Sequence, residues 1–148
     1  MPGVSVTGCG ERGCRRGGGA WNPGSLSMAR THMRIPWWLP FGGVPEVTAG
    51  ELARSLAGEP PPLLLDVRTP LEYRAGHIDG AINVPVTSLA AELPHVALDP
   101  ARPVVAICAT AHRSIPAVRL LLARGLDASQ LAGGMRAWRA ARLPERRA

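Results

Sequence analysis

The sequence has no lysine, only three cysteines and few aromatic residues. All 17 basic residues are arginine, and aromatic residues make up 4% of the 148 positions. Three cysteines are too few for a disulfide framework. No apolar run reaches the roughly 18 residues that a membrane-spanning helix needs, so we expect no membrane span. A chain of this length fits one domain with a hydrophobic core.

Two of the three cysteines, Cys9 and Cys14, lie in a segment rich in glycine and arginine. A zinc site there would need a second pair of Cys or His residues, which the segment lacks, so we expect no metal. The segment also lacks the continuous apolar stretch of a secretory signal. We therefore expect a cytoplasmic protein, in which the third cysteine, Cys108, stays a reduced thiol.

The net charge of +6 is concentrated near the N-terminus, where residues 1–34 contain five arginines and one glutamate. A basic segment can bind nucleic acid or anionic lipid. No nucleic-acid motif accompanies it, which favours a disordered, solvated extension and no nucleic-acid partner. Residues 35–43, IPWWLPFGG, are interpreted as an aromatic and proline-rich linker that either packs over the domain or stays an exposed apolar patch.

Strand-like and helix-like patterns alternate over residues 44–143, which we expect to be the domain, with 144–148 as a basic C-terminal tail. This alternation predicts an α/β fold with a mainly parallel sheet and helices on both faces. The expected strands are 44–47, 63–67, 81–85, 103–107 and 128–131, and the expected helices are 49–57, 70–75, 87–93, 114–124 and 134–141.

Two helix boundaries have specific sequence signals. Thr48 followed by Glu51 is a capping-box pattern, which predicts the start of the first helix. In the helix of residues 114–124, Ile115, Val118 and Leu122 are spaced to share one apolar face.

The stretch VVAICATAHRS places Cys108 at the end of a predicted strand and just before a predicted helix. Sites in open α/β sheets form at the carboxyl ends of strands. The helix dipole, a loop of small residues that can form an anion-binding nest, and the charge of Arg113 would each favour a thiolate. Such a site suits covalent catalysis, in which Cys108 takes a group from a donor and gives it up. The alternative, from this stretch alone, is a buried and inert cysteine.

Three motifs, LLLDVRTPLEYRAGHIDGAINVP (63–85), ICATAHRS (107–114) and LAGGMRAW (131–138), resemble the rhodanese (sulfurtransferase) family. The resemblance covers about residues 44–143. It implies a rhodanese-like fold with a central five-stranded parallel sheet and helices on both faces. It also implies that Cys108 forms a persulfide and that residues 108–113 form an anion-cradling loop with Arg113 as its cationic end. The residues expected to bind substrate are Ala109, Thr110, Ala111, His112, Arg113 and Ser114.

The loop departs from its relatives at Ala111, where related loops often have glycine. If that position requires a positive φ, alanine would be strained by roughly 1 kcal/mol. His112 either lies at the pocket mouth or points to solvent. Thr110 either donates a hydroxyl to a sulfur oxyanion or fills the turn.

Asp66, Arg68 and Glu72 are expected to support the site. The resemblance implies that they form buried polar contacts that brace the loop, although Asp66 and Arg68 could also border the pocket. The remaining motif residues, His77, Gly133, Gly134 and Trp138, are expected to be structural.

These observations favour an enzyme of the thiosulfate sulfurtransferase type. It would move sulfane sulfur from thiosulfate or another persulfide donor to a thiol or cyanide through a Cys108 persulfide, without cofactor or metal. Its partners would be a small sulfur-containing anion or thiol and, further, a sulfur-donor or sulfur-acceptor protein. Cys108 should then lie at the mouth of a shallow pocket, with the N–H groups of 109–114 around its sulfur.

Two alternatives remain. One is a persulfide carrier or docking module that a partner protein loads. The other is a phosphatase or arsenate reductase on the same fold, which we favour less. The loops of those enzymes are one residue longer than the four residues that separate Cys108 from Arg113 here.

Overall fold

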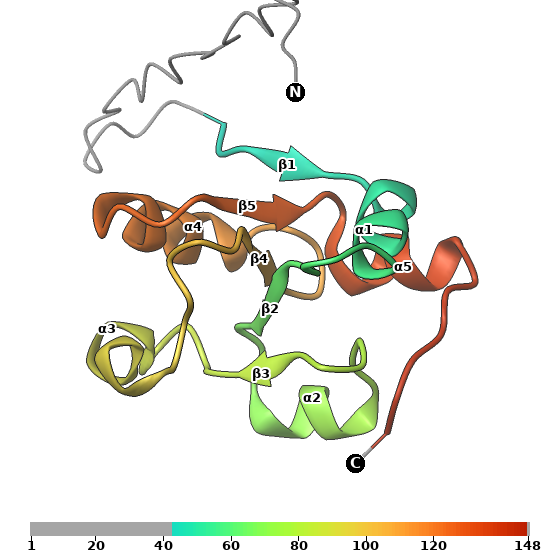
Figure 1. Ribbon diagram of the computed structural model, residues 1–148. Coiled ribbons are helices and arrows are strands. Elements are labelled where there is room, and N and C mark those ends of the chain that lie inside the picture. The colour runs from blue at the N-terminus through green and yellow to red at the C-terminus, as the bar shows by residue number, and fades with distance from the viewer. Residues whose placement is uncertain (1–42, 148) are drawn as a thin grey trace, which may run out of the picture. The chain divides into compact units, whose positions relative to one another are not determined.

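Four successive buried residues make strand β4 (Val104–Ile107) the centre of the sheet. The computed structural model describes residues 43–147, so the expectations for residues 1–34 and for most of the 35–43 linker lie outside the described residues. The strand order is β1-β5-β4-β2-β3 and every pairing is parallel (Figure 1). The other strands are β1 (Glu46–Val47), β2 (Leu63–Asp66), β3 (Ile82–Asn83) and β5 (Ala128–Leu131).

The helices confirm the expected alternation, with one difference. They are α1 (Ala49–Leu56), α2 (Pro70–Ala75), α3 (Leu89–Glu92), the short 3₁₀ turn η1 (Leu93–His95), α4 (Ser114–Ala123) and α5 (Gly134–Ala140). The helix expected over 87–93 is split into α3 and η1, with Pro94 in the first turn of η1. Proline has no N–H to continue the α-helical ladder, which accounts for the change. The expected capping box of Thr48 and Glu51 is present.

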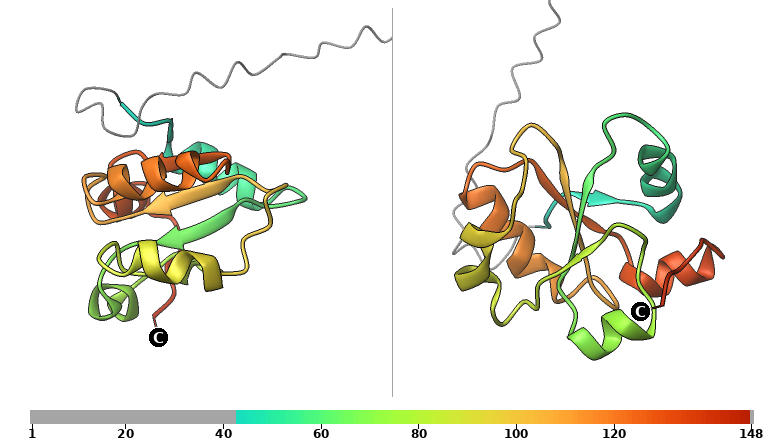
Figure 2. Two further views of the ribbon diagram at one scale, coloured as in Figure 1. Left: turned by 90° about the vertical axis from the view of Figure 1, so that its left-hand side faces the viewer. Right: turned by 60° about the horizontal axis from the view of Figure 1, so that its bottom comes forward.

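Successive side chains along each strand point to opposite faces of the sheet, so the core consists of two clusters, one on each face. One cluster contains Leu65, Val104 and Ala106 together with residues of α3 and α4. The other contains Leu64, Val105 and Ile107 together with residues of α1 and α5. The right-hand view of Figure 2 shows α3 and α4 on one side of the strands and α1 and α5 on the other. The predicted parallel sheet with helices on both faces is therefore confirmed.

The buried face of α4 coincides only partly with the apolar face that its sequence spacing predicts. Its buried residues are Ser114, Ala117, Val118 and Leu121, whereas Leu122 is 39% exposed. Each residue turns the helix by about 100°. The face packed on the sheet is therefore the one that contains Ala117, Val118 and Leu121, and Leu122, one position further on, is turned toward solvent.

The carboxyl ends of β2, β4 and β5 meet at one edge of the sheet, because neighbouring strands are parallel. There α5 is tied to the segment after β4. The N–H groups of Met135 and Arg136 donate to the carbonyls of Cys108 (2.8 Å) and Ala109 (3.1 Å). The first turn of a helix has N–H groups without partners in the helix, and this loop supplies two of the acceptors.

The contacts of the domain continue three residues beyond the expected boundary at 143. The Trp138 indole N–H donates to the Pro144 carbonyl (2.9 Å), and Trp138 is buried as expected. Arg146 exchanges two backbone hydrogen bonds with His77 and forms an ion pair with Asp79. Within residues 43–147, no helix has the length and apolar character to cross a membrane.

Gly134 is required where α5 approaches the segment after β4. Its φ is +58°, and a Cβ there would lie against the Cys108 carbonyl oxygen and 2.7 Å from the Ala109 carbonyl carbon. Gly80 has a similar φ of +76°, but a Cβ there would meet nothing within 4 Å.

We predict that Gly134→Ala lowers the free energy of unfolding by about 3 kcal/mol, because backbone strain and a steric clash add. Gly80→Ala should cost only about 1 kcal/mol, because it introduces strain alone. Urea unfolding of the two variants measures both values. Equal losses would show that α5 does not pack as closely on this segment as described.

Candidate active site

Cys108 is buried, with 1% of its surface exposed. It continues the alternation of Val104 and Ala106 and so faces the α4 side of the sheet, within that apolar cluster. Its polar neighbour is Ser114, whose Oγ lies 3.4 Å from the sulfur. The expected position at the mouth of a shallow pocket is therefore wrong: the side chain points inward, beneath the start of α4.

The segment between β4 and α4 is a turn that contains a left-handed residue. Ala111 has φ +70°, the positive φ at which its alanine side chain is expected to be strained. A Cβ in this region costs roughly 1–2 kcal/mol relative to the right-handed conformation. His112 is exposed, and its Nδ1 lies 3.2 Å from the Thr110 hydroxyl.

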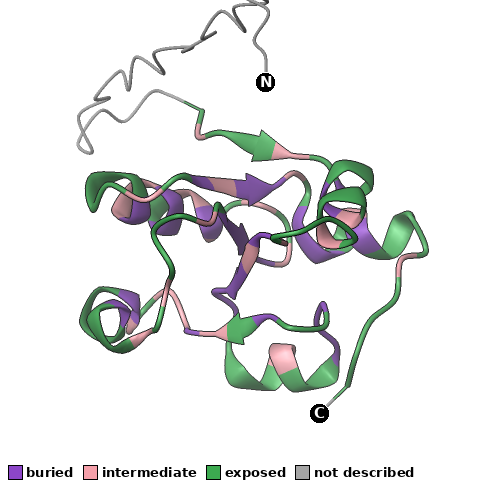
Figure 3. Cartoon of the chain, viewed as in Figure 1, coloured by how far each residue is buried: buried purple, intermediate pink, exposed green. Residues whose placement is uncertain are grey.

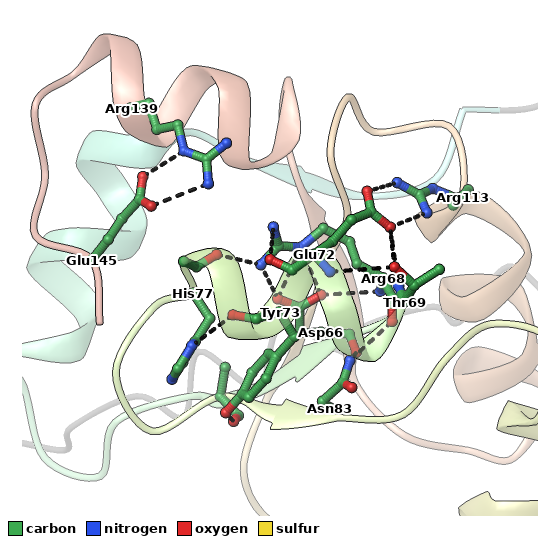
Figure 4. Close-up of polar contacts among 12 residues, drawn as sticks. Asp66, Arg68, Thr69, Glu72, Tyr73, His77, Asn83, Arg113, Arg139 and Glu145 are labelled. Carbon is green, nitrogen blue, oxygen red and sulfur yellow. Dashed lines mark hydrogen bonds and ion pairs between the residues drawn. The ribbon is translucent and has the colours of Figure 1, made fainter. Parts of the chain in front are cut away.

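Arg113 is joined to Glu72 rather than being left open for a ligand. Its two terminal nitrogens donate to the two carboxylate oxygens at 2.8 and 2.6 Å, as Figure 4 shows. The Glu72 carboxylate also accepts from the Thr69 N–H and hydroxyl at the start of α2. The bonds from Arg113, followed by those from Thr69, lower the pKa of Glu72 to about 2. Glu72 thus connects α2 to the loop, but the two side chains are 38% and 35% exposed, so this contact is not buried as the resemblance implied.

A negative charge on Cys108 would also act on Arg113. The pKa of Arg113 is raised mainly by its bond to Glu72, and a negative Cys108 is among the smaller causes. Arg113 therefore lies close enough to interact electrostatically with a thiolate, although its hydrogen bonds go to Glu72.

Asp66 and Arg68 form a buried pair beneath α2. Arg68 Nη2 lies 2.6 Å from Asp66 Oδ2, and the side chains are 3% and 0% exposed. Arg68 also donates to the carbonyls of Glu72 and Gly76. The Asn83 amide donates to the carbonyls of Asp66 and Arg68. These bonds fix the segment that follows β2 against α2 (Figure 4), which confirms the expected ion pair.

A cavity of about 280 Å³ lies beside the loop. The loop contributes Ala109 and Thr110, and the walls come from α2, α5 and the end of β2. Arg68 therefore both forms the ion pair and borders the cavity. The complete lining is Arg68, Glu72, Ala75, Ala109, Thr110, Met135, Arg136 and Arg139.

The expected substrate-binding residues do not share one surface. Ala109 and Thr110 line the cavity, whereas Ser114 is fully buried next to Cys108. Ala111 and His112 are absent from the cavity lining.

Sequence reasoning missed two residues near the site. Gln130 lies on β5, is 3% exposed and accepts a hydrogen bond from Ser114. Its sequence signal is an amide side chain within the short strand expected over 128–131. Arg136 lies just after Gly133 and Gly134 and borders the cavity. It belongs to the LAGGMRAW motif, but no role was expected for it. No group of three or more His, Cys, Asp or Glu residues that could bind a metal occurs within residues 43–147.

The family model for the rhodanese-like domain matches residues 48–141. The chain belongs to the rhodanese-like family. A sulfurtransferase of Allochromatium vinosum is 32% identical over 102 residues, which cover 68% of this chain and 94% of that protein. An HTH-type transcriptional regulator of Mycobacterium tuberculosis is 43% identical over 107 residues. The match covers 69% of this chain but only 46% of the regulator.

Solved rhodanese-like structures share the fold of this chain. A rhodanese-related protein of Thermoplasma volcanium aligns with TM-score 0.63 and 28% identity, over 69% of this chain and 97% of that one. A thiosulfate sulfurtransferase of Pseudomonas aeruginosa aligns with TM-score 0.64 and 29% identity, over 70% of this chain and 20% of that one. The expected family and fold are thereby confirmed.

Replacing Ala111 with glycine should relieve the strain of the rhodanese loop. We expect Ala111→Gly to raise the free energy of unfolding by about 1 kcal/mol, since glycine adopts positive φ without a Cβ clash. Ala109→Gly is the matched control, because Ala109 is not among the residues with positive φ. It should lower stability by about 0.5 kcal/mol, because glycine adds conformational entropy to the unfolded chain. Destabilisation by both substitutions in urea titrations would argue against a left-handed Ala111.

The bond between Glu72 and Arg113 should make stability depend on pH. The pKa of Glu72 is about 2 in the folded protein and 4.5 without these partners, so its ionised form is stabilised by folding. The contribution is fully present above about pH 4.5 and is lost as pH falls toward 2. Wild type should therefore exceed Glu72→Gln in stability near neutral pH, and the gap should close over that interval.

Urea unfolding midpoints across the acid range measure this gap. Glu92→Gln removes a carboxylate on the exposed side of α3 and serves as the control. A gap between wild type and Glu72→Gln that stayed constant from neutral pH to pH 2 would contradict the ionic character of the bond.

Proposed function

We propose that this chain is a sulfurtransferase that carries sulfane sulfur as a persulfide on Cys108. The observation that carries the proposal is the position of Cys108: it directly follows the central strand, opens the loop before α4, and lies 3.4 Å from the hydroxyl of Ser114 at the start of that helix. The similarity to a named sulfurtransferase over 94% of that protein's length supports the same reaction class. A reducing, cytoplasmic setting belongs to the proposal because the cycle needs a free thiol.

The proposed reaction has two displacement steps. The Cys108 thiolate attacks the outer sulfur of thiosulfate, forming a sulfur–sulfur bond. The bond from that sulfur to the sulfonate group breaks, and its electron pair leaves with sulfite. Cyanide or an acceptor thiolate then attacks the terminal persulfide sulfur and returns Cys108 as a thiolate. The helix α4 begins at Ser114, so its positive end favours the anionic sulfur.

The cavity beside the loop does not include Cys108, but its arginines would attract an anionic donor toward the loop. Two arginines on its wall already have ion-pair partners: Arg68 binds Asp66, and Arg139 binds Glu145. Arg136 is exposed, and within residues 43–147 its side chain has no ion-pair partner. We therefore propose that Arg136 attracts the sulfonate group of the donor.

The persulfide is tested by intact mass after brief exposure to thiosulfate. Wild type should gain one sulfur atom, cyanide should remove it, and Cys108→Ser should gain none. Because Cys9 and Cys14 are also present, peptide mapping should place the added sulfur on Cys108. A gain that persists in Cys108→Ser would refute the assignment.

The role of Arg136 is tested by steady-state kinetics with thiosulfate and cyanide. Arg136→Gln should raise KM for thiosulfate about threefold, the size expected for an exposed charge interaction, and leave kcat nearly unchanged. Arg74→Gln removes the same charge from the exposed side of α2, away from the cavity lining, and should leave KM as in wild type. Equal effects of the two substitutions would show only a general dependence on net charge.

A second candidate is a persulfide carrier that receives its sulfur from one partner protein and passes it to another. Two observations favour it: Cys108 is only 1% exposed, and the identity to a transcriptional regulator, 43%, exceeds that to the named sulfurtransferase. Loading by a cysteine desulfurase with cysteine, in parallel with loading by thiosulfate, separates the two candidates. Fast loading by thiosulfate supports the enzyme, whereas loading by the desulfurase alone supports the carrier.

A further inference from the structure

A buried chain of hydrogen bonds leads from Cys108 to the edge of the sheet. The Cys108 sulfur lies 3.4 Å from Ser114 Oγ, and Ser114 Oγ donates to Gln130 Oε1 at 2.6 Å. Gln130 Nε2 in turn donates to Glu46 Oε1 at 2.6 Å. Cys108, Ser114 and Gln130 are 1%, 0% and 3% exposed, and only Glu46 is exposed to solvent. This chain is separate from the Glu72–Arg113 bond and from the cavity.

The sheet register explains why these groups meet. Gln130 of β5 is the direct partner of Glu46 of β1, so their side chains lie on the same face of the sheet. The strand β5 also neighbours β4, which ends next to Cys108. Figure 3 shows β1 as an exposed edge strand beside the buried β5.

The direction of each hydrogen bond follows from the end of the chain. A carboxylate can only accept, so Glu46 holds the NH₂ group of the Gln130 amide toward itself. The amide oxygen of Gln130 must then face Ser114, and the Ser114 hydroxyl proton is used to bond it. What Ser114 presents to the sulfur is a lone pair, which accepts from an S–H group and repels a thiolate.

We propose that Gln130, oriented by Glu46, is a positioning residue that restrains Cys108 reactivity by holding the Ser114 hydroxyl proton away from the sulfur. This inference rests on the proposed role of Cys108 as the nucleophile. For Ser114 to stabilise a thiolate, its hydroxyl must turn to the sulfur and leave the Gln130 oxygen without its donor. Burial makes that loss costly, because water does not reach the vacated oxygen.

The test is the rate at which iodoacetamide alkylates Cys108 in the full chain, followed by mass spectrometry of the Cys108 peptide. Gln130→Met keeps a side chain of similar length but accepts the Ser114 proton only weakly. The freed hydroxyl can then donate to the thiolate, and we expect alkylation at neutral pH to be about tenfold faster, as for one hydrogen bond to a charged group.

The double variant Gln130→Met with Ser114→Ala distinguishes this device from loosened packing. If the freed hydroxyl causes the gain, removing it must return the rate to that of Ser114→Ala alone. A gain that survives in the double variant, or no gain in Gln130→Met, would overturn the proposal.

Glu46→Gln provides a variant that leaves the buried residues in place. An amide at position 46 can either donate or accept, so Gln130 is no longer fixed in one orientation. The alkylation rate should rise by a smaller factor than in Gln130→Met, with an unchanged thermal midpoint. An unchanged rate would contradict the role of Glu46.

Alkylation of the Cys108 peptide reports this thiol alone and does not require sulfur transfer. If the variants behave as expected but thiosulfate gives no persulfide, the restraint stands and the proposed function fails. If thiosulfate loads Cys108 but the variants alkylate as wild type does, the function stands and the restraint fails.

Discussion

The arrangement of the site depends on two hydrogen bonds, from the first turn of α5 to the carbonyls of Cys108 and Ala109. They anchor the beginning of the loop to an element that follows a different strand. They form only because Gly134 lets the two backbones approach closely. Parallel pairing of β2, β4 and β5 brings the three connections to one edge, and these bonds then fix how Cys108 leaves the sheet. The far end of the loop is fixed separately, through Glu72 and Arg113.

Because the loop is held at its start by α5 and at its end by Glu72, its charged and polar groups are already engaged. The hydrogen bonds of the Arg113 guanidinium go to Glu72, so Arg113 would stabilise an anionic Cys108 sulfur only through its electric field. Cys108 itself points toward the α4 side, and its direct polar contact is Ser114. In the proposed reaction, an anionic sulfur would be stabilised mainly by fixed charges and the start of α4, with the neutral Ser114 hydroxyl adjacent to it.

Local signals in the sequence predicted most of the fold because they act over a few residues. The capping box of Thr48 and the apolar runs of β2 and β4 each determine one boundary. The three motifs gave the family and the position of Cys108. What could not be predicted depends on distant parts of the chain or on the exact residue at which a strand ends. The partnership of Ser114 with Gln130 and Glu46 requires the register of β1 on β5, and the inward direction of Cys108 depends on where the alternation of β4 ends.

The most direct test of the account is a crystal structure of the protein after treatment with thiosulfate. The account predicts one additional sulfur atom bonded to Cys108 Sγ. It also predicts that the Cys108 and Ala109 carbonyls still accept from α5 and that Glu72 still binds Arg113. A treated protein whose Cys108 carries no sulfur, with the added atom on another cysteine, would contradict the claim that this loop is built to hold a persulfide.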